Sequence, residues 1–266
     1  MHPFLNTAFK AVRKASHMML QMQARLETLT ISKKGESDYV SEVDKQAEAI
    51  LVDAIRTAYP DHGIIAEEGT VINRQAVINW IIDPLDGTTN YLHGLPQFCI
   101  SIAVQVKGKI THGLIYEPWH EALYTASLGC GAHCNDRRMR VSQHKELGES
   151  LIATGLPYRN RDHLPAYMAQ LQTLYHHIDD MRRSGSAALD LAYVACGRLD
   201  GYFEWGLKPW DIAAGALMVK EAGGFVSDLS GGQAFLQSGH ILAANNKIFQ
   251  PLQQLLASSP GQGNPS

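Results

Sequence analysis

Two aspartates stand close together in the stretch WIIDPLDGTTN, which runs from Trp80 to Asn90. Three apolar residues precede Asp83, and Asp86 is followed by a glycine and two hydroxyl side chains. Two carboxylates this close in a low-dielectric cleft repel each other by several kcal/mol unless a cation lies between them. The simplest cation that meets this need is a hard divalent metal ion.

The residues around the two aspartates suit the same interpretation. Pro84 sets a backbone turn, and Leu85 can direct its carbonyl at the ion. Gly87 permits a close approach, and Thr88 and Thr89 begin a helix whose free N–H groups suit a phosphate. The alternative is a tight turn with an aspartate at a helix N-cap, which requires no ligand.

Further carboxylates favour the metal hypothesis. Glu67 and Glu68 follow the apolar run GIIA, and Asp211 stands at the start of a predicted helix in KPWDIAAG. An aspartate before a helix is also an ordinary N-cap, so Asp211 alone is weak evidence. Oxygen ligands without a matching histidine or thiol set select magnesium or manganese over zinc. We therefore expect Mg²⁺, with Mn²⁺ as a substitute.

Cys130, His133 and Cys134 form the one local group that resembles a zinc site. Only three candidate ligands lie in this loop, and the sequence specifies no fourth ligand. A structural role is therefore the preferred interpretation. The histidines elsewhere are scattered, and His93, beside the aspartate motif, is the one to follow in the structure.

Composition excludes several classes of protein. The chain has 266 residues, of which 45% are hydrophobic and 18% charged, with a formal net charge of −3 and four cysteines. This predicts an ordinary globular protein with no basic field for direct nucleic-acid binding. Lys10, Arg13 and Lys14 interrupt the apolar residues near the N-terminus, which argues against a signal peptide or a membrane span. The cysteines form no disulfide framework, so a cytoplasmic location is expected.

Residues 1–149 predict two helices packed on a mainly antiparallel sheet. The first helix is predicted from apolar residues at steps of three and four: Phe4, Ala8, Val12, Ala15, Met19, Met22 and Leu26. A second helix is predicted from Ser41 to Ala58, with Asp44 in a capping-box position and Pro60 as the stop. The predicted strands cover residues 63–69, 80–82, 99–106, 110–116 and 123–126.

Residues 150–257 alternate strands with helices, which predicts an α/β arrangement that completes the site. The predicted strands cover residues 150–156, 200–205, 224–229 and 240–245. The predicted helices cover about 164–177, 187–199 and 211–223. Residues 258–266 are composed mainly of Gly, Ser, Pro and Gln and are predicted to be a disordered tail. No linker separates the halves, so we expect the site where they meet.

The motifs AEEG, WIIDPLDGTTNYLHGLP, GAHCND and GSAALDLAYVACGRLDGYFEWGLKPWDIAAGALMVKEAGG together resemble the inositol monophosphatase family, nearest its bacterial SuhB-type branch. The resemblance extends from the first helix to about Asn246. It implies an alternating αβαβα sandwich, usually assembled as a homodimer. It also implies Mg²⁺-dependent hydrolysis of a phosphate monoester, with inhibition by lithium.

The same resemblance implies roles for individual residues. One Mg²⁺ would be held by Glu67, Asp83 and the Leu85 carbonyl, and a second by Asp83, Asp86 and Asp211. Thr88 and Asp44 would help the metal to activate the attacking water, with Glu67 near that water. Contacts with the substrate are implied for Asp86, Gly87, Thr88, Gly185, Ala187, Glu204 and Asp211. Within this set, the amides of Gly87 and Thr88 would take phosphate oxygens, and Gly185, Ala187 and Glu204 would contact a polyol.

The first choice of substrate is myo-inositol 1-phosphate. Fructose-1,6-bisphosphate, NADP and a 3'-phosphonucleotide are alternatives within the superfamily. Glu204 favours a neutral polyol, because a carboxylate accepts hydrogen bonds from hydroxyls and repels a second phosphate. A hypothesis of another class is an adaptor role, since SuhB-type proteins are associated with ribosomal RNA transcription through contact with the elongation machinery.

Overall fold

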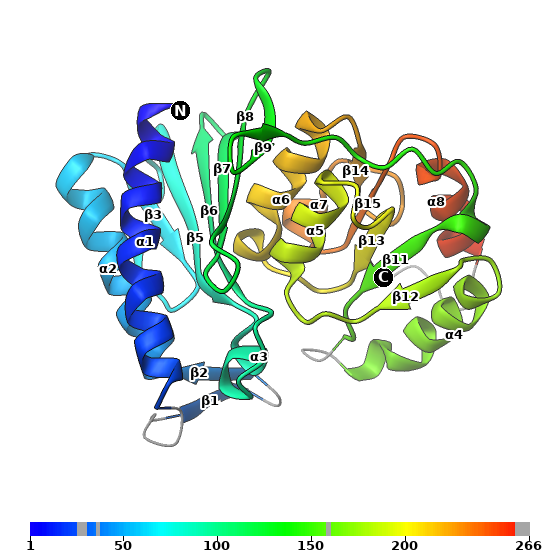
Figure 1. Cartoon of the computed structure of the whole chain (residues 1–266), viewed down its shortest axis with the longest axis horizontal. Helices are drawn as coiled ribbons and strands as arrows, with labels where there is room; N and C mark the ends of the chain where they lie inside the picture. The colour runs from blue at the N-terminus through cyan, green and yellow to red at the C-terminus, as the bar shows by residue number, and fades with distance from the viewer. Residues whose placement is uncertain (26–30, 36–37, 158–160, 259–266) are drawn as a thin grey trace.

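The computed structural model describes residues 1–25, 31–35, 38–157 and 161–258, which form alternating layers of helices and sheets (Figure 1). Helices α1 (Pro3–Gln23) and α2 (Glu42–Ala58) cover one face of an eight-stranded sheet. Helices α5 (Ala187–Ala195) and α6 (Pro209–Glu221) lie between this sheet and a five-stranded sheet. Helices α4 (Leu164–Tyr175) and α8 (Phe249–Ser258) cover the far side. The predicted αβαβα sandwich is confirmed.

The eight-stranded sheet has the order β10-β9-β8-β7-β6-β5-β3-β4, and β3 and β5 form its parallel pair. Its strands are β3 (Gly63–Ala66), β4 (Val71–Ile72), β5 (Ile78–Asp86), β6 (Cys99–Val106), β7 (Lys109–Glu117), β8 (Ala122–Ser127), β9 (Gly131–Cys134) and β10 (Arg137–Arg138). The remaining pairs in this sheet are antiparallel, as the sequence predicts.

The five-stranded sheet has the order β12-β11-β13-β15-β14 and combines parallel with antiparallel pairs. Its strands are β11 (Leu151–Thr154), β12 (Asp180–Arg182), β13 (Gly201–Glu204), β14 (Phe225–Ser227) and β15 (Ile241–Ala244). The smaller elements are the hairpin β1 (Ile31–Gly35) and β2 (Asp38–Ser41), helices α3 (Thr88–Leu92) and α7 (Phe235–Ser238), and 3₁₀ turns at Leu147–Glu149 and Arg161–His163.

The predicted elements match these positions, with a few differences at their ends. The strand predicted to end at Ile82 continues to Asp86, because β6 remains its partner beyond Pro84. The sequence did not predict the hairpin β1–β2, the strands β4, β9, β10 and β12, or the helices α7 and α8. Predicted core residue Leu26 lies outside the described residues, as does the predicted tail apart from Ser258, the last residue of α8. The predicted boundary after residue 149 stays a prediction.

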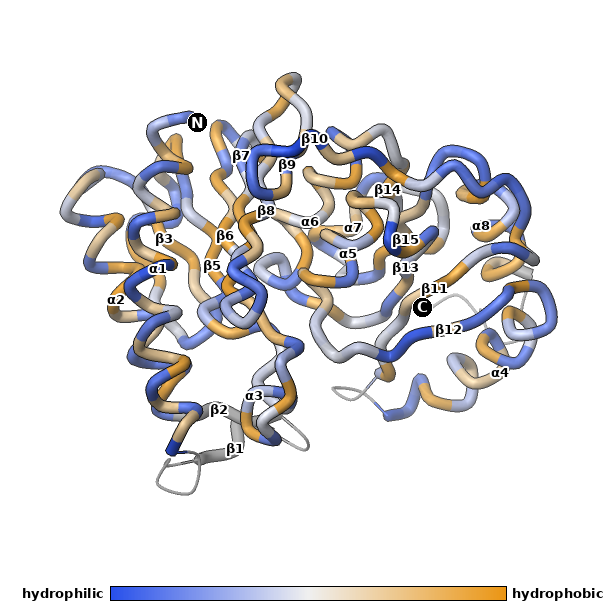
Figure 2. The backbone as a smooth tube through the Cα atoms, viewed as in Figure 1, coloured by the Kyte–Doolittle hydropathy of each residue, from blue (hydrophilic) through white to orange (hydrophobic). Residues whose placement is uncertain are grey.

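Helix α6 is the centre of the packing. It is buried along almost its whole length, including Ala213, Ala214 and Met218, because a sheet covers it on each side. Apolar colour follows α6 and strands β5 to β7, whereas β12 is hydrophilic (Figure 2). The buried cluster around α6 contains residues from both halves of the chain, such as Ile81 and Leu191. None of the described helices combines the length and the hydropathy needed to cross a bilayer.

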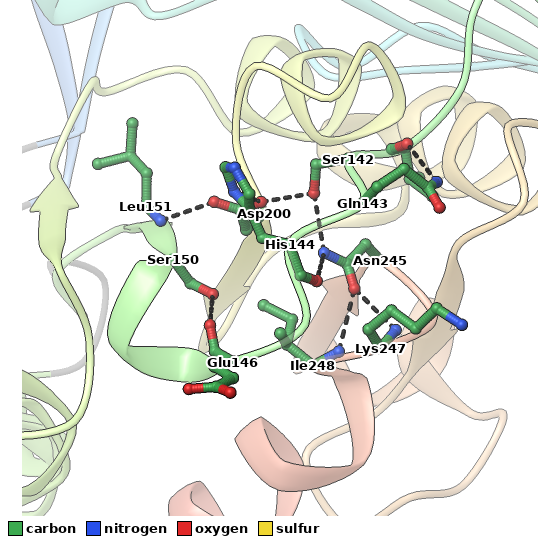
Figure 3. A network of polar contacts seen from close by, with 11 residues as sticks. Ser142, Gln143, His144, Glu146, Ser150, Leu151, Asp200, Asn245, Lys247 and Ile248 are labelled. Carbon is green, nitrogen blue, oxygen red and sulfur yellow. Dashed lines mark hydrogen bonds and ion pairs between the residues drawn. The ribbon is translucent and has the colours of Figure 1, made fainter.

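A buried polar network joins the segment between the two sheets to the five-stranded sheet (Figure 3). Asp200 accepts hydrogen bonds from the Ser142 hydroxyl at 2.5 Å and from the Leu151 backbone N–H at 2.8 Å. Asn245 donates to Ser142 at 2.8 Å and accepts from the backbone of Ile248 at the start of the last helix. Because Asp200 and Asn245 are both buried, these hydrogen bonds hold the connecting segment against the five-stranded sheet.

We predict that Gly215→Ala destabilises the fold by about 1–3 kcal/mol, because a Cβ at Gly215 would lie 2.5 Å from Leu191 Cβ where α5 crosses α6. Urea unfolding checks this value. Gly148→Ala is the matched control, since a Cβ there meets no atom within 4 Å. If both variants are as stable as the wild type, helices α5 and α6 do not pack closely enough at Gly215 to exclude a methyl group.

Candidate active site

A cavity of about 450 Å³ opens where the end of β5 meets the N-termini of α5 and α6. It is lined by every residue that the sequence predicts for the site except Asp44. These are Glu67, Asp83, Leu85, Asp86, Gly87, Thr88, Gly185, Ala187, Glu204 and Asp211. The structure brings the predicted residues together, and their individual roles stay predictions.

An irregularity in β5 explains why both aspartates face the cavity. Asp83 pairs with Ser101 and Asp86 pairs with Cys99, so β5 has one residue more than β6 between these two pairs. Without this bulge, residues three apart on a strand would point to opposite faces. Pro84 is tolerated at this point because a bulge interrupts the ladder of hydrogen bonds.

Asp83 lies at the centre of the acidic cluster. Its exposed fraction is 1%, and its Oδ1 accepts a hydrogen bond from the Leu85 backbone N–H at 3.0 Å. Burial raises the pKa of Asp83 well above its ordinary value, and the charges of Glu67, Asp86 and Asp211 raise it further. A side-chain hydrogen bond with Glu67 has the same effect, because it favours the protonated form of Asp83.

Helix α5 holds Asp86 through its first turn. Asp86 Oδ2 accepts hydrogen bonds from the Ser186 hydroxyl at 2.6 Å and from the Ala188 N–H at 2.7 Å. Burial and the charge of Asp211 raise the pKa of Asp86 to about 6, although these hydrogen bonds act in the opposite direction. Asp86 is therefore kept in place even though its charge is unfavourable there.

Asp211 lines the cavity from the first turn of α6. Its Oδ2 accepts a hydrogen bond from the Lys208 N–H at 2.7 Å, where the helix begins after Lys208. Asp211 is thus the third helical residue and caps the helix from inside, rather than serving as the N-cap itself. The capping role and the position in the cavity exist together.

Asp44 reaches the cavity through Thr88. The Thr88 hydroxyl lies 3.1 Å from Asp44 Oδ1 and 3.1 Å from the Leu85 carbonyl oxygen, and it has one proton to donate between them. Asp44 is buried on α2, behind the lining residues. Gly87 precedes Thr88 with φ +96°, and a Cβ there would lie 2.8 Å from the Gln97 carbonyl oxygen, so glycine is required.

Glu204 faces the cavity from the end of β13 and is only 7% exposed. Glu204 is therefore not a solvated surface charge. The Tyr202 hydroxyl donates to Glu204 Oε2 at 2.6 Å, and a Cβ on Gly155 would lie 2.0 Å from the carboxyl carbon. Burial raises the pKa of Glu204 to about 7, whereas the hydrogen bond from Tyr202 and the charge of Arg183 lower it.

Sequence reasoning missed several residues of the site. Arg183 and Asn90 line the cavity, together with His93, which the sequence had singled out. Arg183 is part of a basic pair that is too short to indicate nucleic-acid binding, and its position just before Gly185 is the signal that could have identified it. Buried Glu48 accepts hydrogen bonds from the backbone N–H groups of Glu68 at 2.7 Å and Thr70 at 3.2 Å, so it fixes the turn that carries Glu67.

The donor set fits a hard cation. Five carboxylates line the cavity, and Arg183 is the one permanent cation among the described residues that line it. Burial and the neighbouring charges raise the pKa of Asp83, and a bound cation would instead stabilise the ionised carboxylates. No three described His, Cys, Asp or Glu side chains already surround a single metal position. Rotation of the carboxylates would therefore have to complete a coordination shell.

A five-layer sandwich with an acidic cavity at the N-termini of its inner helices defines a class of protein, and comparisons agree on that class. Residues 1–259 match the model of the inositol monophosphatase family. The chain is 45% identical over 253 residues to the Nus factor SuhB of Escherichia coli, covering 95% of each protein.

Two solved structures are similar along the whole chain. The extragenic suppressor protein suhB from Bartonella henselae has a TM-score of 0.93 at 42% identity, covering 97% of this chain and 99% of that one. An inositol monophosphatase from Anabaena has a TM-score of 0.86 at 39% identity, covering 97% and 96%. The chain therefore belongs to the inositol monophosphatase family, and the resemblance seen in the sequence is confirmed.

We predict that Asp86→Asn gains stability relative to the wild type as the pH rises from 5 to 8 in EDTA. Because the pKa of Asp86 is raised to about 6, the folded protein keeps a proton that the unfolded chain releases near pH 4, and stability is lost as the pH rises from about 4 to about 6. About half of this loss falls above pH 5, so the relative gain of the variant should be ~1.4 kcal/mol. Asparagine removes this loss while its amide oxygen keeps the acceptor for Ser186 and Ala188.

Urea unfolding of both proteins at each pH measures the effect. The quantity to compare is the difference in the free energy of unfolding between the two proteins. Burial lowers the pKa values of His62, His112 and His240, so these histidines make both proteins more stable as the pH rises. Their contribution cancels in the difference. A difference that is constant with pH would contradict the electrostatic account of the cavity.

Proposed function

We propose that the protein is a Mg²⁺-dependent phosphatase for monoesters of small polyols, with myo-inositol 1-phosphate as the first choice. The observation that carries the proposal is the excess of carboxylates beside the N–H groups that begin α3. These groups have no partner inside the helix and suit phosphate oxygens. An anionic cavity accepts a phosphate dianion only when added cations balance the charge. The similarity to the inositol monophosphatase from Anabaena supports the same activity.

The proposed metal ligands are the predicted ones. Glu67, Asp83 and the Leu85 carbonyl would hold one Mg²⁺, and Asp83 would share a second with Asp86 and Asp211. Bound Mg²⁺ would neutralise the phosphate dianion and lower the pKa of a water molecule that attacks it. In the absence of a cation, burial and repulsion work against the same carboxylates, which is why we assign them this role.

Side chains and backbone amides of the protein would orient the attacking water, take up its proton and bind the phosphate. The Thr88 hydroxyl and Asp44 form a hydrogen-bonded pair at 3.1 Å, placed to orient the attacking water and to take up its proton. The backbone amides of Gly87, the N-cap of α3, and of Thr88, its first residue, would hold phosphate oxygens during the transfer. This helix has only five residues, so the amides contribute through hydrogen bonds rather than through a large dipole.

The opposite end of the cavity would recognise the alcohol part of the substrate. Glu204 is fixed by Tyr202 and can accept hydrogen bonds from ring hydroxyls, while Gly185 and Ala187 leave room for the ring. The homodimer, the cytoplasmic location and the sensitivity to lithium that the resemblance implies are parts of the same proposal. Fructose-1,6-bisphosphate, NADP and a 3'-phosphonucleotide remain the alternative substrates for a panel assay.

A second candidate function is an adaptor role in transcription. It rests on the name of the similar Escherichia coli protein, Nus factor SuhB. The two functions do not exclude each other, because an adaptor uses the outer surface and hydrolysis uses the cavity. A gene copy with Asp83→Asn in a deletion strain separates them: restored growth assigns the cellular role to the surface.

We predict that turnover of myo-inositol 1-phosphate requires added Mg²⁺ and is lost in EDTA and in Asp83→Asn. The substitution removes the carboxylate proposed to bridge both ions, while its amide oxygen still accepts the bond from the Leu85 N–H. The metal-free variant should unfold at a urea concentration no lower than the wild type, because a source of repulsion has gone. Full activity of the metal-stripped wild type in chelator would refute the metal assignment.

We predict that Glu204→Ala raises KM for myo-inositol 1-phosphate roughly 10- to 150-fold, since a hydrogen bond to a charged group contributes about 1.5–3 kcal/mol. The value of kcat should change little if this binding is equally present in the transition state. A plain aryl phosphate lacks the ring hydroxyls and should be almost unaffected. Tyr202→Phe is the control, because it removes the bond to Glu204 and leaves the carboxyl group in the cavity. Equal losses for both substrates would overturn the role in polyol recognition.

A further inference from the structure

The loop between β12 and α5 forms one wall of the cavity. Arg183 and Gly185 line the cavity from this β12–α5 loop, and Ser184 stands between them in the chain. These three residues belong to no helix or strand, so the hydrogen bonds of a regular element do not hold them in place. We propose that Asn90 and Asp190 are positioning residues that hold the loop through Ser184, and that the fixed loop makes the enzyme selective for a polyhydroxylated ring. This role rests on the proposed phosphatase activity.

Asn90 joins the β12–α5 loop to helix α3. Its side-chain Nδ2 donates to the Ser184 carbonyl oxygen at 2.8 Å and to the Gln97 carbonyl oxygen at 2.7 Å, so both of its hydrogens are used. Asn90 is the third residue of α3, and the amides proposed to bind phosphate lie at the start of this helix. The Asn90 side chain therefore connects the helix proposed to bind phosphate with the loop proposed to contact the polyol.

Asp190 holds the same loop from helix α5. The Ser184 hydroxyl donates a hydrogen bond to Asp190 Oδ1, and Asp190 is only 2% exposed in the first turn of α5. Burial raises the pKa of Asp190 well above its ordinary value, although the hydrogen bond from Ser184 acts in the opposite direction. The charges of Glu204 and Asp86 raise this pKa further. Asp190 serves the loop as a hydrogen-bond acceptor, which the carbonyl oxygen of an asparagine can also be.

Close packing fixes the loop relative to both ends of the cavity. Gly185 has φ +89°, and a Cβ there would lie 2.9 Å from Asn90 Nδ2 and 2.7 Å from Arg183 Nη1. Ser186, the N-cap of α5, follows the loop and donates its hydroxyl to Asp86 Oδ2 at 2.6 Å. The loop is therefore held against α3 on one side and against Asp86, one of the proposed metal ligands, on the other.

A fixed wall matters more for a polyol than for a plain aryl phosphate. A polyol binds through several hydroxyl groups, whose hydrogen bonds need partners at defined positions. When the loop is mobile, binding of a polyol has to order it, and the entropy lost in this step weakens the affinity. An aryl phosphate without ring hydroxyls depends mainly on the phosphate end of the cavity. Loss of one hydrogen bond to the loop should raise KM for a polyol phosphate roughly 3- to 10-fold, which corresponds to ~0.7–1.4 kcal/mol.

Steady-state kinetics of three full-length variants with Mg²⁺ test the role. Ser184→Ala removes the hydroxyl that donates to Asp190, and it should raise KM for myo-inositol 1-phosphate by this factor while kcat and turnover of an aryl phosphate change little. Asp190→Asn keeps an acceptor for Ser184 and should resemble the wild type. Asn90→Leu has a similar shape but no donor, and it should weaken polyol binding at least as much as Ser184→Ala. Far-ultraviolet circular dichroism checks that the variants fold.

Hydrogen exchange of the metal-free proteins measures the loop independently of activity. Amides of the β12–α5 loop should exchange about threefold faster or more in Ser184→Ala and Asn90→Leu than in the wild type and Asp190→Asn, with α6 unchanged. Absence of turnover in the wild type would refute the phosphatase activity and the selectivity, whereas exchange would still decide whether the loop is held. The positioning role is overturned if the loop exchanges equally in all four proteins, if Asp190→Asn loosens it as much as Ser184→Ala, or if Ser184→Ala impairs both substrates equally.

Discussion

Repulsion between carboxylates that are held in contact is the constraint on which the rest of this structure depends. Asp83 lies close enough to Glu67, Asp86 and Asp211 for their charges to raise its pKa. Flexible side chains would turn away from one another to relieve this repulsion. They are prevented from doing so because each aspartate accepts a backbone N–H: Leu85 for Asp83, Ala188 for Asp86 and Lys208 for Asp211. Holding the carboxylates together therefore lowers the stability of the folded protein.

These tethers depend on the order of the layers. The N-termini of α5 and α6 can reach the end of β5 because both helices are sandwiched between the two sheets (Figure 1). Small residues such as Gly215 let the two helices approach closely, which brings the first turn that holds Asp86 next to the one that carries Asp211. The buried core around α6 therefore sets the distances inside the cavity, although none of its apolar residues takes part in the chemistry.

The sequence predicted the site well wherever the signal was local. Asp83, Asp86, Gly87 and Thr88 stand within one short motif, and the predicted strands and helices around them were found in the structure. The bulge was not predictable, because it depends on how β5 pairs with β6. Taken alone, Pro84 predicts the end of a strand.

Residues that act through distant contacts were also missed. Nothing in the local sequence shows that the carboxylate of Glu48, on helix α2, accepts a hydrogen bond from the turn after β3. The sequence did not predict that Arg183 lines the cavity, because the other lining residues come from distant elements of the chain.

The same constraint bears on the choice between hydrolysis and an adaptor role. An adaptor acts through its outer surface and has no physical need for buried charges that repel one another. Asparagine at Asp83 or Asp86 would keep the backbone hydrogen bonds and remove the repulsion, so these positions could lose their charge without loss of the fold. Glu204 could likewise be replaced by glutamine and still accept from Tyr202. This chain has a carboxyl group at every one of these positions, at a cost in stability that binding of the proposed cation and phosphate would offset.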